Sequence, residues 1–348
     1  MRSMNKVVFL AIGVLLLTPF AWAQSYKLTN LGTLKRGSAR VHDINAVGEI
    51  VGESGYPHGS ETHALIWKKQ GGIKDLGFLP GGDYSVATAI SDAGQVVGTS
   101  NSTNGMHGFL WTKTNGLTQL TSMHPSDNSS AHAINQSGQI AGASGSHAAL
   151  WTANVIKDLG TLGGEWSEAH GLNNTGQVVG VADTPSAPHA FLWTDGLGMK
   201  DLGVLQGDSS SRANHINDQG NVVGSSEGIQ GVRAFLWTPT GGIQELPSLP
   251  SGSYSEAFAI NNRGQIVGQS GSSLGTRAVL WCNGSVVDLN DLVPDLPVGT
   301  ILTGAFSIND NGQIVAFGVH NPSLNKNRDA KMDDHLHSGP THVYLLRP

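Results

Sequence analysis

Residues 243–281 read IQELPSLPSGSYSEAFAINNRGQIVGQSGSSLGTRAVLW, and this stretch contains four short apolar segments separated by Gly, Asn, Ser and Pro. The segments IQEL, EAFAIN, QIVGQS and RAVLW have the length of strands and not of helices. The 47 glycines and 14 prolines of the chain would interrupt any long helix, while Val, Ile, Phe and Trp cluster inside the short segments. The stretch therefore predicts four β-strands.

The same unit recurs along the chain with a period of about 44 residues, which is typical of propeller blades and of helical solenoids. A segment like HAFLW follows each copy of the phrase INxxGQIVG. The seven copies of the phrase begin at Ile44, Ile90, Ile134, Leu172, Ile216, Ile260 and Ile308. Because the segments are strands, a helical solenoid is excluded. Four antiparallel strands repeated seven times predict an all-β fold, a seven-bladed β-propeller.

The two ends of the chain predict how the ring closes. The segment YKLTNLGTL, which begins at Tyr26, matches the strand written KDLG in other units, and HVYLL at 342–346 matches HAFLW. We expect the strand near Leu28 to be the outermost strand of the last blade, paired with the three strands that end at Leu346. The sequence thus predicts a single propeller over residues 24–348, with a loop insertion at 320–341.

The first 23 residues predict export. Arg2 and Lys6 precede an apolar run at 7–17, and Ala21-Trp22-Ala23 fits a cleavage site. We therefore expect a signal peptide at 1–23, cleavage near Ala23, and a secreted, periplasmic or cell-surface protein. No other segment approaches twenty apolar residues, so no transmembrane segment is predicted in the mature protein.

The composition indicates which partners are not expected and what stabilises the fold. The net charge is −6 and only 13% of residues are charged, without any cluster of Lys or Arg, so nucleic acid is not an expected partner. The single thiol, Cys282, cannot form an internal disulfide, so packing and ring closure must hold the fold. A monomer is expected.

The motifs HAFLW, KDLGTLGG, SxAxxIN and GQVVG, clearest from Asp158 to Trp193, resemble those of the HAF-repeat family of extracellular bacterial proteins. The resemblance covers nearly all of the mature chain. It implies a secreted or surface-associated propeller-like protein, and it implies no particular reaction.

The strand order predicts two unlike faces. The turns INxxGQ and WTxxGGI are uniform and lie on one face, the bottom face, whereas the loops between blades and before HAFLW are irregular and lie on the other, the top face. Irregular loops on a rigid scaffold are where binding sites usually occur. Three aromatic residues occupy equivalent top-face positions, and two have an acid just before them: Tyr84 with Asp83, Trp166 with Glu165, and Tyr254. Rings beside carboxylates suit sugar recognition, although rings at repeat positions can also cap blade interfaces.

Histidines form two groups. His63, His107, His147, His189 and His342 open the HAFLW-like strand, where two blades have Arg233 and Arg277 instead. Because Arg donates hydrogen bonds but does not ligate metals as imidazole does, we expect a structural donor role toward the backbone or a neighbouring blade. His42, His132 and His170 share a position on the innermost strand. They either line a polar pocket in the channel or lie between blades.

The insertion at 320–341 contains Asp333, Asp334, His335 and His337, whose oxygen and nitrogen atoms could bind a divalent metal ion, although their spacing matches no established motif. The alternative for this segment is a flap over the channel. No cofactor is predicted beyond this metal ion.

Strong enzyme motifs such as GxSxG, HExxH or a phosphate-binding glycine loop are absent. We therefore expect a non-catalytic scaffold that binds an extracellular polysaccharide or another surface polymer through its top face. The alternative is a carbohydrate-active hydrolase or lyase that uses top-face acids and histidines, for example Glu168 with Glu256 or Asp83 with Glu165.

Overall fold

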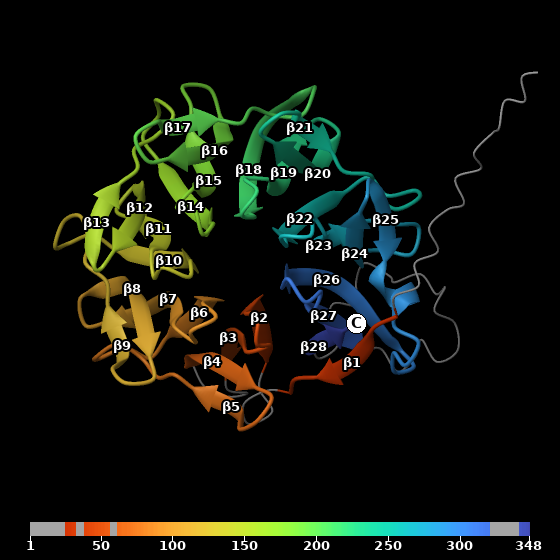
Figure 1. Cartoon of the computed structure of the whole chain (residues 1–348), viewed down its shortest axis with the longest axis horizontal. Helices are drawn as coiled ribbons and strands as arrows, with labels where there is room; N and C mark the ends of the chain where they lie inside the picture. The colour runs from red at the N-terminus through yellow and green to blue at the C-terminus, as the bar shows by residue number, and fades with distance from the viewer. Residues whose placement is uncertain (1–24, 33–37, 56–60, 321–340) are drawn as a thin grey trace, which may run out of the picture.

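A computed structural model describes residues 25–32, 38–55, 61–320 and 341–348. These residues form seven four-stranded antiparallel sheets arranged in a ring around a central channel (Figure 1). The fold is the seven-bladed β-propeller that the repeat predicts. The predicted signal peptide and nearly all of the insertion at 320–341 lie outside the described residues.

Blades are numbered from the N-terminus, and blades 1 to 6 use their strands in chain order from the channel outward, while blade 7 takes β1 as its outermost strand. The innermost strands are β2 (Ala39–Ile44), β6 (Ser85–Ile90), β10 (Ser129–Ile134), β14 (Ser167–Leu172), β18 (Asp208–Ile216), β22 (Ser255–Ile260) and β26 (Thr300–Ile308). The second strands are β3 (Ile50–Gly55), β7 (Val96–Ser102), β11 (Ile140–Ser144), β15 (Val178–Asp183), β19 (Val222–Gly228), β23 (Ile266–Ser270) and β27 (Ile314–His320).

The third strands are β4 (Thr62–Lys68), β8 (Gly105–Thr112), β12 (His147–Thr152), β16 (Pro188–Thr194), β20 (Gly231–Thr238), β24 (Arg277–Cys282) and β28 (Thr341–Arg347). The outermost strands are β5 (Gly72–Asp75), β9 (Gly116–Gln119), β13 (Val155–Asp158), β17 (Gly198–Asp201), β21 (Gly242–Glu245), β25 (Ser285–Asp288) and β1 (Lys27–Asn30). A 3₁₀ turn, η1 (Leu289–Leu292), is the one helical element among the described residues, and no helix in this part of the chain is long and apolar enough to cross a membrane.

The innermost strand of every blade carries a β-bulge at the same position. In blade 1 the pairing of β2 with β3 shifts between Val41 and Asp43, so that His42 is the extra residue. The bulge brings the carbonyl oxygen of Arg40 so close to β3 that a Cβ atom on Gly52 would lie 2.0 Å from it. This close approach explains the last glycine of GQIVG in blades 1 to 6, whereas blade 7 has Ala316 at the equivalent position. As a result, two successive residues, His42 and Asp43, both line the channel.

The hydrophobic core lies between blades and not within them. Trp193 of blade 4 packs with Ala148 and Leu150 of blade 3, and the equivalent tryptophans occupy the corresponding interfaces. On the outer side, Nζ of Lys157 lies 4.8 Å from the centre of the Trp193 ring. The recurring tryptophan therefore joins neighbouring blades, as predicted.

Ring closure also follows the prediction. β1 pairs with β28, with Leu28 opposite Leu346, and completes blade 7. Val343 of that blade packs in one cluster with Val41 and Trp67 of blade 1. The first and last parts of the chain are therefore joined by a sheet and by a core.

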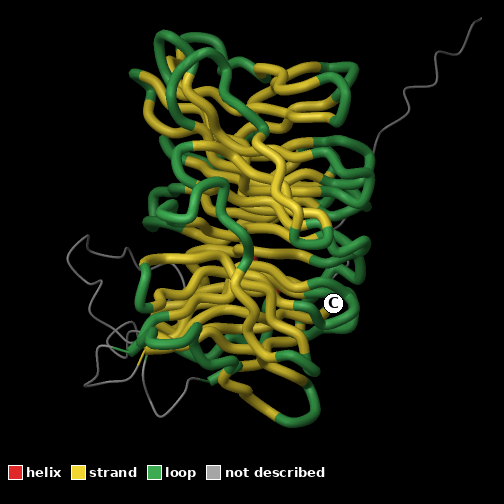
Figure 2. Tube along the Cα trace, turned by 90° about the vertical axis from the view of Figure 1, so that its left-hand side faces the viewer, coloured by secondary structure: helices red, strands yellow, loops and turns green. Residues whose placement is uncertain are grey.

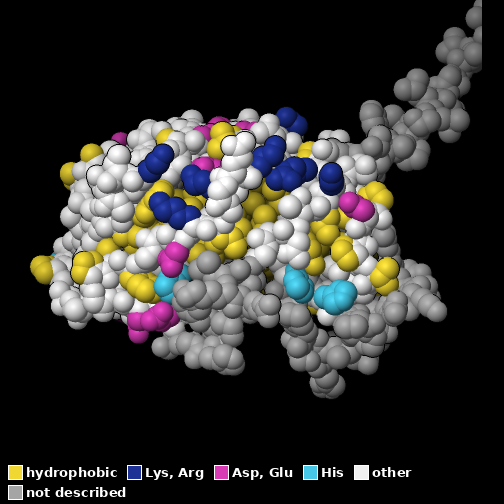
Figure 3. All heavy atoms as spheres, turned by 90° about the horizontal axis from the view of Figure 1, so that it is seen from below, with side chains coloured by type: hydrophobic (Ala, Val, Ile, Leu, Met, Phe, Trp, Pro, Cys, Tyr) yellow, Lys and Arg dark blue, Asp and Glu magenta, His cyan; other side chains and the backbone are white. Residues whose placement is uncertain are grey.

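Viewed edge-on, the disc has strands that run between two faces, and the loops lie on those faces (Figure 2). The channel runs from the top face, which carries the loops between blades, to the bottom face, which carries the INxxGQ turns. The rim near β1 and β5 carries Lys and Arg side chains toward one edge and histidines toward the other (Figure 3).

Candidate functional site

The bulged residues form a layer in the middle of the channel, which we call the bulge layer. It consists of His42, Thr88, His132, His170, Asn214, Phe258 and Phe306, and all seven line a cavity of about 160 Å³. Of the two positions considered for His42, His132 and His170, the channel is therefore the one observed. Three members also bind the next blade: Thr88 donates to the carbonyl of Ala131 at 2.7 Å, Asn214 donates to that of Ala257 at 2.9 Å, and Nδ1 of His170 lies 3.0 Å from that of Ala213.

One side of the bulge layer is a cluster around Glu168, a residue of β14. Nε2 of His132 lies 3.0 Å from Oε1 of Glu168, and Nε2 of His170 lies 3.6 Å from Oε2. Hydrogen bonds from His132 and then from His170 hold the pKa of Glu168 well below its usual range, despite burial. This carboxyl group is therefore an ionised acceptor at the edge of the channel.

The cluster does not have the geometry of a serine nucleophile. The hydroxyl oxygen of Ser130 lies 2.8 Å from Nε2 of His132. This is the same ring nitrogen that contacts Glu168. A catalytic triad requires the serine and the carboxylate on opposite nitrogens of the imidazole. The arrangement suits hydrogen bonding to a bound molecule.

The opposite side of the layer is aromatic. The rings of Phe258 and Phe306 stack with centroids 4.8 Å apart and an interplanar angle of 12°, and Phe317 packs against Phe306 at 4.6 Å. Because Phe258 and Phe306 line the same cavity as His132 and His170, this cavity has an apolar wall and a polar wall.

A larger cavity of about 550 Å³ adjoins this layer in blades 1 and 7, and both cavities are lined by His42 and Phe306. Burial, followed by the charges of Arg40 and His132, lowers the pKa of His42 to about 4. Its buried Nε2 atom has no hydrogen-bond partner in the described chain. Arg40 and Glu53 also line the larger cavity, with 3.9 Å between guanidinium and carboxylate.

The three predicted top-face aromatics lie on blades 2, 4 and 6 and line neither of these cavities. Trp166 is 37% exposed. Tyr254 donates its hydroxyl to Glu256 at 3.0 Å, and burial is the main cause that raises the pKa of its phenol. Tyr84 is half-buried. Their role in binding stays a prediction.

The acids beside two of these rings differ in their contacts. Asp83 accepts a hydrogen bond from Nδ2 of Asn101 at 2.6 Å, while Glu165 is exposed. The carboxylate pair Glu168 and Glu256 is separated by blade 5, and each member already has partners of its own.

Among the histidines that open the third strand, His63, His147 and His189 contact the acid on the outermost strand of the same blade and not the predicted backbone or neighbouring blade, and the ring nitrogens of His107 have no hydrogen-bond partner in the described chain. The Nδ1–Oδ2 distances are 2.7 Å for His63 and Asp75, 2.9 Å for His147 and Asp158, and 2.9 Å for His189 and Asp201. Arg233 pairs with Glu245 at 2.6 Å in the same way. The exchange of His for Arg therefore preserves a contact with an acid at the edge of the blade.

Sequence reasoning missed the layer below the bulge. Its residues directly follow the bulged ones: Asp43, Ala89, Ala133, Gly171, His215, Ala259 and Ser307. Five of the blades have a small residue here, and only blades 1 and 5 have a titratable residue at this position, Asp43 and His215. The sequence did contain a signal for this layer, because Asp43 and His215 stand at a repeat position where the other blades have Ala, Gly or Ser.

The four predicted metal ligands, Asp333, Asp334, His335 and His337, lie outside the described residues. Among the residues that are described, no group of three or more His, Cys, Asp or Glu side chains could hold a metal ion.

No protein-family model and no curated protein matches the chain. Virginiamycin B lyase from Staphylococcus aureus has a similar structure, with a TM-score of 0.58 and 12% identity over 93% of this chain and 99% of that one. The extracellular domain of a putative hybrid two-component system from B. thetaiotaomicron gives 0.54 and 10%, over 92% of this chain and 39% of that one. Puromycin hydrolase gives 0.54 and 12%, over 81% and 50%. At such identities the likeness shows the fold alone, and the chain is a seven-bladed β-propeller.

Proposed function

We propose that this chain is an exported propeller that binds an extracellular carbohydrate at the top end of its channel. The proposal includes membership of the HAF-repeat family and cleavage of a signal peptide near Ala23, from which a secreted, periplasmic or cell-surface location follows. The observation that carries it is the cavity in which stacked Phe258 and Phe306 face His132 and His170.

A sugar ring matches these two walls. Its C–H face packs on aromatic rings, while its hydroxyl groups donate to carboxylates and accept from cationic or imidazole donors. Phe306 supplies the ring, Glu168 supplies an ionised acceptor behind the histidines, and Arg40 supplies an exposed donor in the adjoining cavity. The unpaired Nε2 of His42 is a further group available to a hydroxyl.

The test is retention of the purified protein on a panel of insoluble polysaccharides. Phe306→Ala should weaken retention at least about tenfold, since an aromatic anchor at the centre of a site is worth more than 1.4 kcal/mol. Ile229→Ala is the matched control, because Ile229 is 98% exposed on a top-face loop and lines neither cavity. Equal retention of the two variants would reject this site.

The predicted aromatics are tested in the same assay. Loss of retention in Trp166→Ala and Tyr84→Ala, with Phe306→Ala unaffected, would place binding on the outer top loops instead. Circular dichroism of each variant separates lost binding from unfolding.

The second candidate function is cleavage of a carbohydrate by a hydrolase or lyase. It is favoured by the Glu168 cluster, because the imidazoles of His132 and His170, held in place by the Glu168 carboxylate, can exchange protons with a bound substrate. New reducing ends or unsaturated products from any polysaccharide of the panel, abolished in Glu168→Gln, would support catalysis. Retention without products would leave binding alone.

A further inference from the structure

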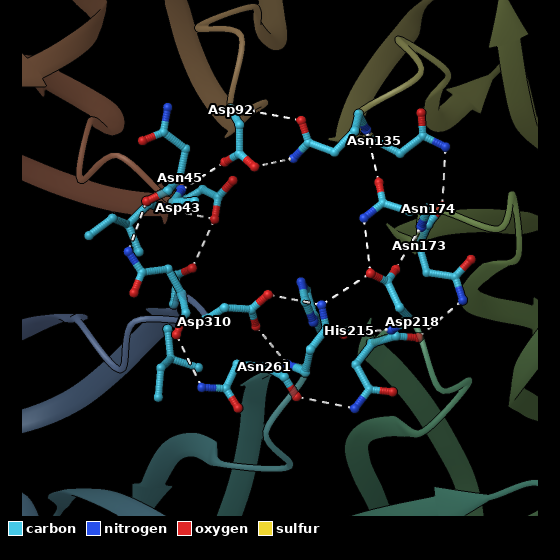
Figure 4. Close-up of a pocket in the computed structure, with 18 of the residues that line it drawn as sticks. Asp43, Asn45, Asp92, Asn135, Asn173, Asn174, His215, Asp218, Asn261 and Asp310 are labelled. Atoms are coloured by element: carbon cyan, nitrogen blue, oxygen red, sulfur yellow. Dashed lines mark hydrogen bonds between the residues drawn. The ribbon is translucent and has the colours of Figure 1, made fainter.

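The polar side chains at the bottom mouth of the channel satisfy one another. In six blades the Asn of the INxxGQ turn donates to the backbone of another blade, as Nδ2 of Asn217 does to the carbonyl of Asn261 at 3.1 Å. Asp218 accepts from Nδ2 of Asn174 and from Nδ2 of Asn262, both at 3.0 Å. Figure 4 shows Asn174 and Asp218 joined in this way beside the open centre. The hydrogen bonds at this end are thus made within the protein.

The larger cavity in blades 1 and 7 contains polar groups that are not satisfied in this way. Arg40 and Glu53 stand directly opposite each other on β2 and β3, and 3.9 Å separates the guanidinium nitrogen from the carboxylate oxygen. This distance is too long for a hydrogen bond, and neither side chain forms one with another described residue. The side chain of Glu53 is only 16% exposed, and burial raises the pKa of its carboxyl group while the charge of Arg40 lowers it. The two charges balance each other, but their hydrogen-bonding capacity remains available.

Blade 1 is the only blade with opposite charges at these two positions. Blade 4 has Glu168 opposite Val181, and blade 5 has Arg212 opposite Ser225. The polar pair of blade 6, Glu256 and Gln269, is closed by hydrogen bonds to the hydroxyl of Tyr254. The scaffold therefore does not require the charge pair of blade 1, which is open toward the cavity.

His42 provides a second, independent sign of a missing partner. It lines both cavities, and its buried Nε2 atom has no hydrogen-bond partner in the described chain. Burial, followed by the charges of Arg40 and His132, keeps the pKa of His42 at about 4, so the imidazole is neutral at pH 7. A nitrogen of a neutral imidazole donates in one tautomer and accepts in the other. A hydroxyl group can satisfy either tautomer, whereas an ammonium only donates and a carboxylate only accepts.

We propose that the sugar unit in the larger cavity is uncharged, with two neighbouring hydroxyl groups bound between Arg40 and Glu53 and a third bound at His42. One hydroxyl accepts from the guanidinium and its neighbour donates to the carboxylate, so both charges gain a partner and no further charge enters. A uronic acid would bring a carboxylate beside Glu53, and an amino sugar would bring an ammonium beside Arg40.

The walls and size of the cavity agree with such a ligand. Phe306 and Phe317 line it and offer aromatic surface to the C–H face of a sugar ring. Its volume of about 550 Å³ lies within the usual range of ligand pockets, about 300 to 1,000 Å³. This inference rests on the proposed function, because it specifies the class of carbohydrate that the same site binds.

The test compares polysaccharides that share a backbone and differ in charge. The whole purified protein is mixed at pH 7 with insoluble cellulose and mannan, which are neutral, with their 6-carboxylated derivatives, and with chitosan. We expect retention on at least one neutral polysaccharide to be at least about tenfold stronger than on its carboxylated derivative and on chitosan. The preference should persist when NaCl is raised from about 0.15 M to about 0.5 M, because it does not depend on attraction between net charges.

Two variants unbalance the charge pair in opposite directions. Glu53→Gln leaves Arg40 without its counter-charge and should shift the ratio of retention about tenfold toward the carboxylated polymers. Arg40→Gln leaves Glu53 unbalanced and should shift the ratio toward chitosan by a similar factor. Gln269 already stands at the position of Glu53 in blade 6, so Glu53→Gln is compatible with the fold.

Arg212→Gln is the matched control. Arg212 is exposed, stands at the position of Arg40 in blade 5 and lines neither cavity, so its variant should leave both ratios unchanged. Unchanged ratios in Glu53→Gln and Arg40→Gln, with both variants folded by circular dichroism, would overturn this inference.

The panel also separates this inference from the proposed function. Retention on a charged polymer that equals or exceeds retention on the neutral ones, and that is lost in Phe306→Ala, would overturn the uncharged ligand and leave carbohydrate binding at this site standing. Absence of retention on every polymer would reject the proposed function, and the inference with it.

Discussion

Nε2 of His132 lies 3.0 Å from Oε1 of Glu168, and the two residues belong to neighbouring innermost strands, β10 and β14. The pair is therefore both a part of the channel wall and a contact between blades 3 and 4. Its geometry gives the candidate site an ionised acceptor, and it couples the stability of the ring to the charge of one carboxyl group.

Glu168→Gln should lower the free energy of unfolding at pH 6 by about 1 kcal/mol, a value discounted because the pair is partly exposed to solvent. The pKa of Glu168 is lowered in the folded state, so its contribution is present above the ordinary glutamate value and is lost as the pH falls below it. The difference between the two proteins should therefore shrink between pH 5 and about pH 2 in denaturant titrations.

The control for this prediction is Glu165→Gln, which changes an exposed acid on the loop that precedes β14. It should leave the unfolding free energy at pH 6 within about 0.5 kcal/mol of the unaltered protein. A difference for Glu168→Gln that grows toward acid pH would show that the ion pair does not stabilise the ring.

The buried Asn of the INxxGQ turn gives a second prediction. Nδ2 of Asn217 donates to Asn261, and its Oδ1 accepts from the backbone N of Asn221 at 3.0 Å. Asn217→Ala removes these bonds in a buried place and should cost about 2 kcal/mol. Asn217→Ser should cost less, because Ser91 occupies this position in blade 2 and accepts from Gln95 at 3.2 Å. If urea titrations show that Asn217→Ala and Asn217→Ser lose the same unfolding free energy, this prediction is wrong.

The strand number, strand order and ring closure could be predicted because each depends on a short pattern that recurs in every blade. The pairing of Leu28 with Leu346 follows from the motif alone, although the two residues are at opposite ends of the chain. The structural donor role of His63 could be predicted from its exchange with Arg, but its partner Asp75 could not. Identifying that partner required the register of β4 with β5.

The channel side chains could not be assigned because a bulge breaks the alternation of a strand. In a regular strand His42 and Asp43 would face opposite sides, and the sequence leaves both positions open for His42. The signal was present in Gly52, whose lack of a Cβ atom permits the approach of the Arg40 carbonyl. The cavity formed with Phe306 depends on ring closure and has no signal in a single blade.

Gly180 gives a third prediction, which tests the bulge. A Cβ atom here would lie 2.0 Å from the carbonyl oxygen of Glu168, a backbone atom that cannot move away cheaply. Gly180→Ala should therefore cost about 3 kcal/mol or more, or prevent folding. Gly55→Ala is the control, because its nearest neighbour would lie 3.7 Å away. The thermal midpoints of the two variants check the prediction, and an unchanged midpoint for Gly180→Ala would show that the backbone accommodates a Cβ atom here as it does at Ala316, the equivalent residue of blade 7.

His42 gives the last prediction, which concerns pH. Its folded pKa of about 4 lies below the ordinary value of 6.5, so the unfolded chain takes up the proton first as the pH falls. The stability that depends on neutral His42 is thus fully present above about pH 6.5 and is lost progressively down to about pH 4, with a total loss of about 3 kcal/mol. His42→Phe introduces the residue found at this position in blades 6 and 7 and should flatten the profile over this window.

The matched control is His124→Phe, which removes an exposed histidine outside the channel. Denaturant titrations at pH 7.5, 6, 5 and 4 should show the steep loss in the unaltered protein and in the control, and a shallower one in His42→Phe. This window overlaps that of Glu168 only between about pH 5 and pH 4, so the loss between pH 6.5 and pH 5 isolates the effect of His42. Parallel profiles for His42→Phe and the unaltered protein would mean that His42 is not held neutral in the channel, and its Nε2 atom would then be a cationic donor toward the sugar instead of a neutral group.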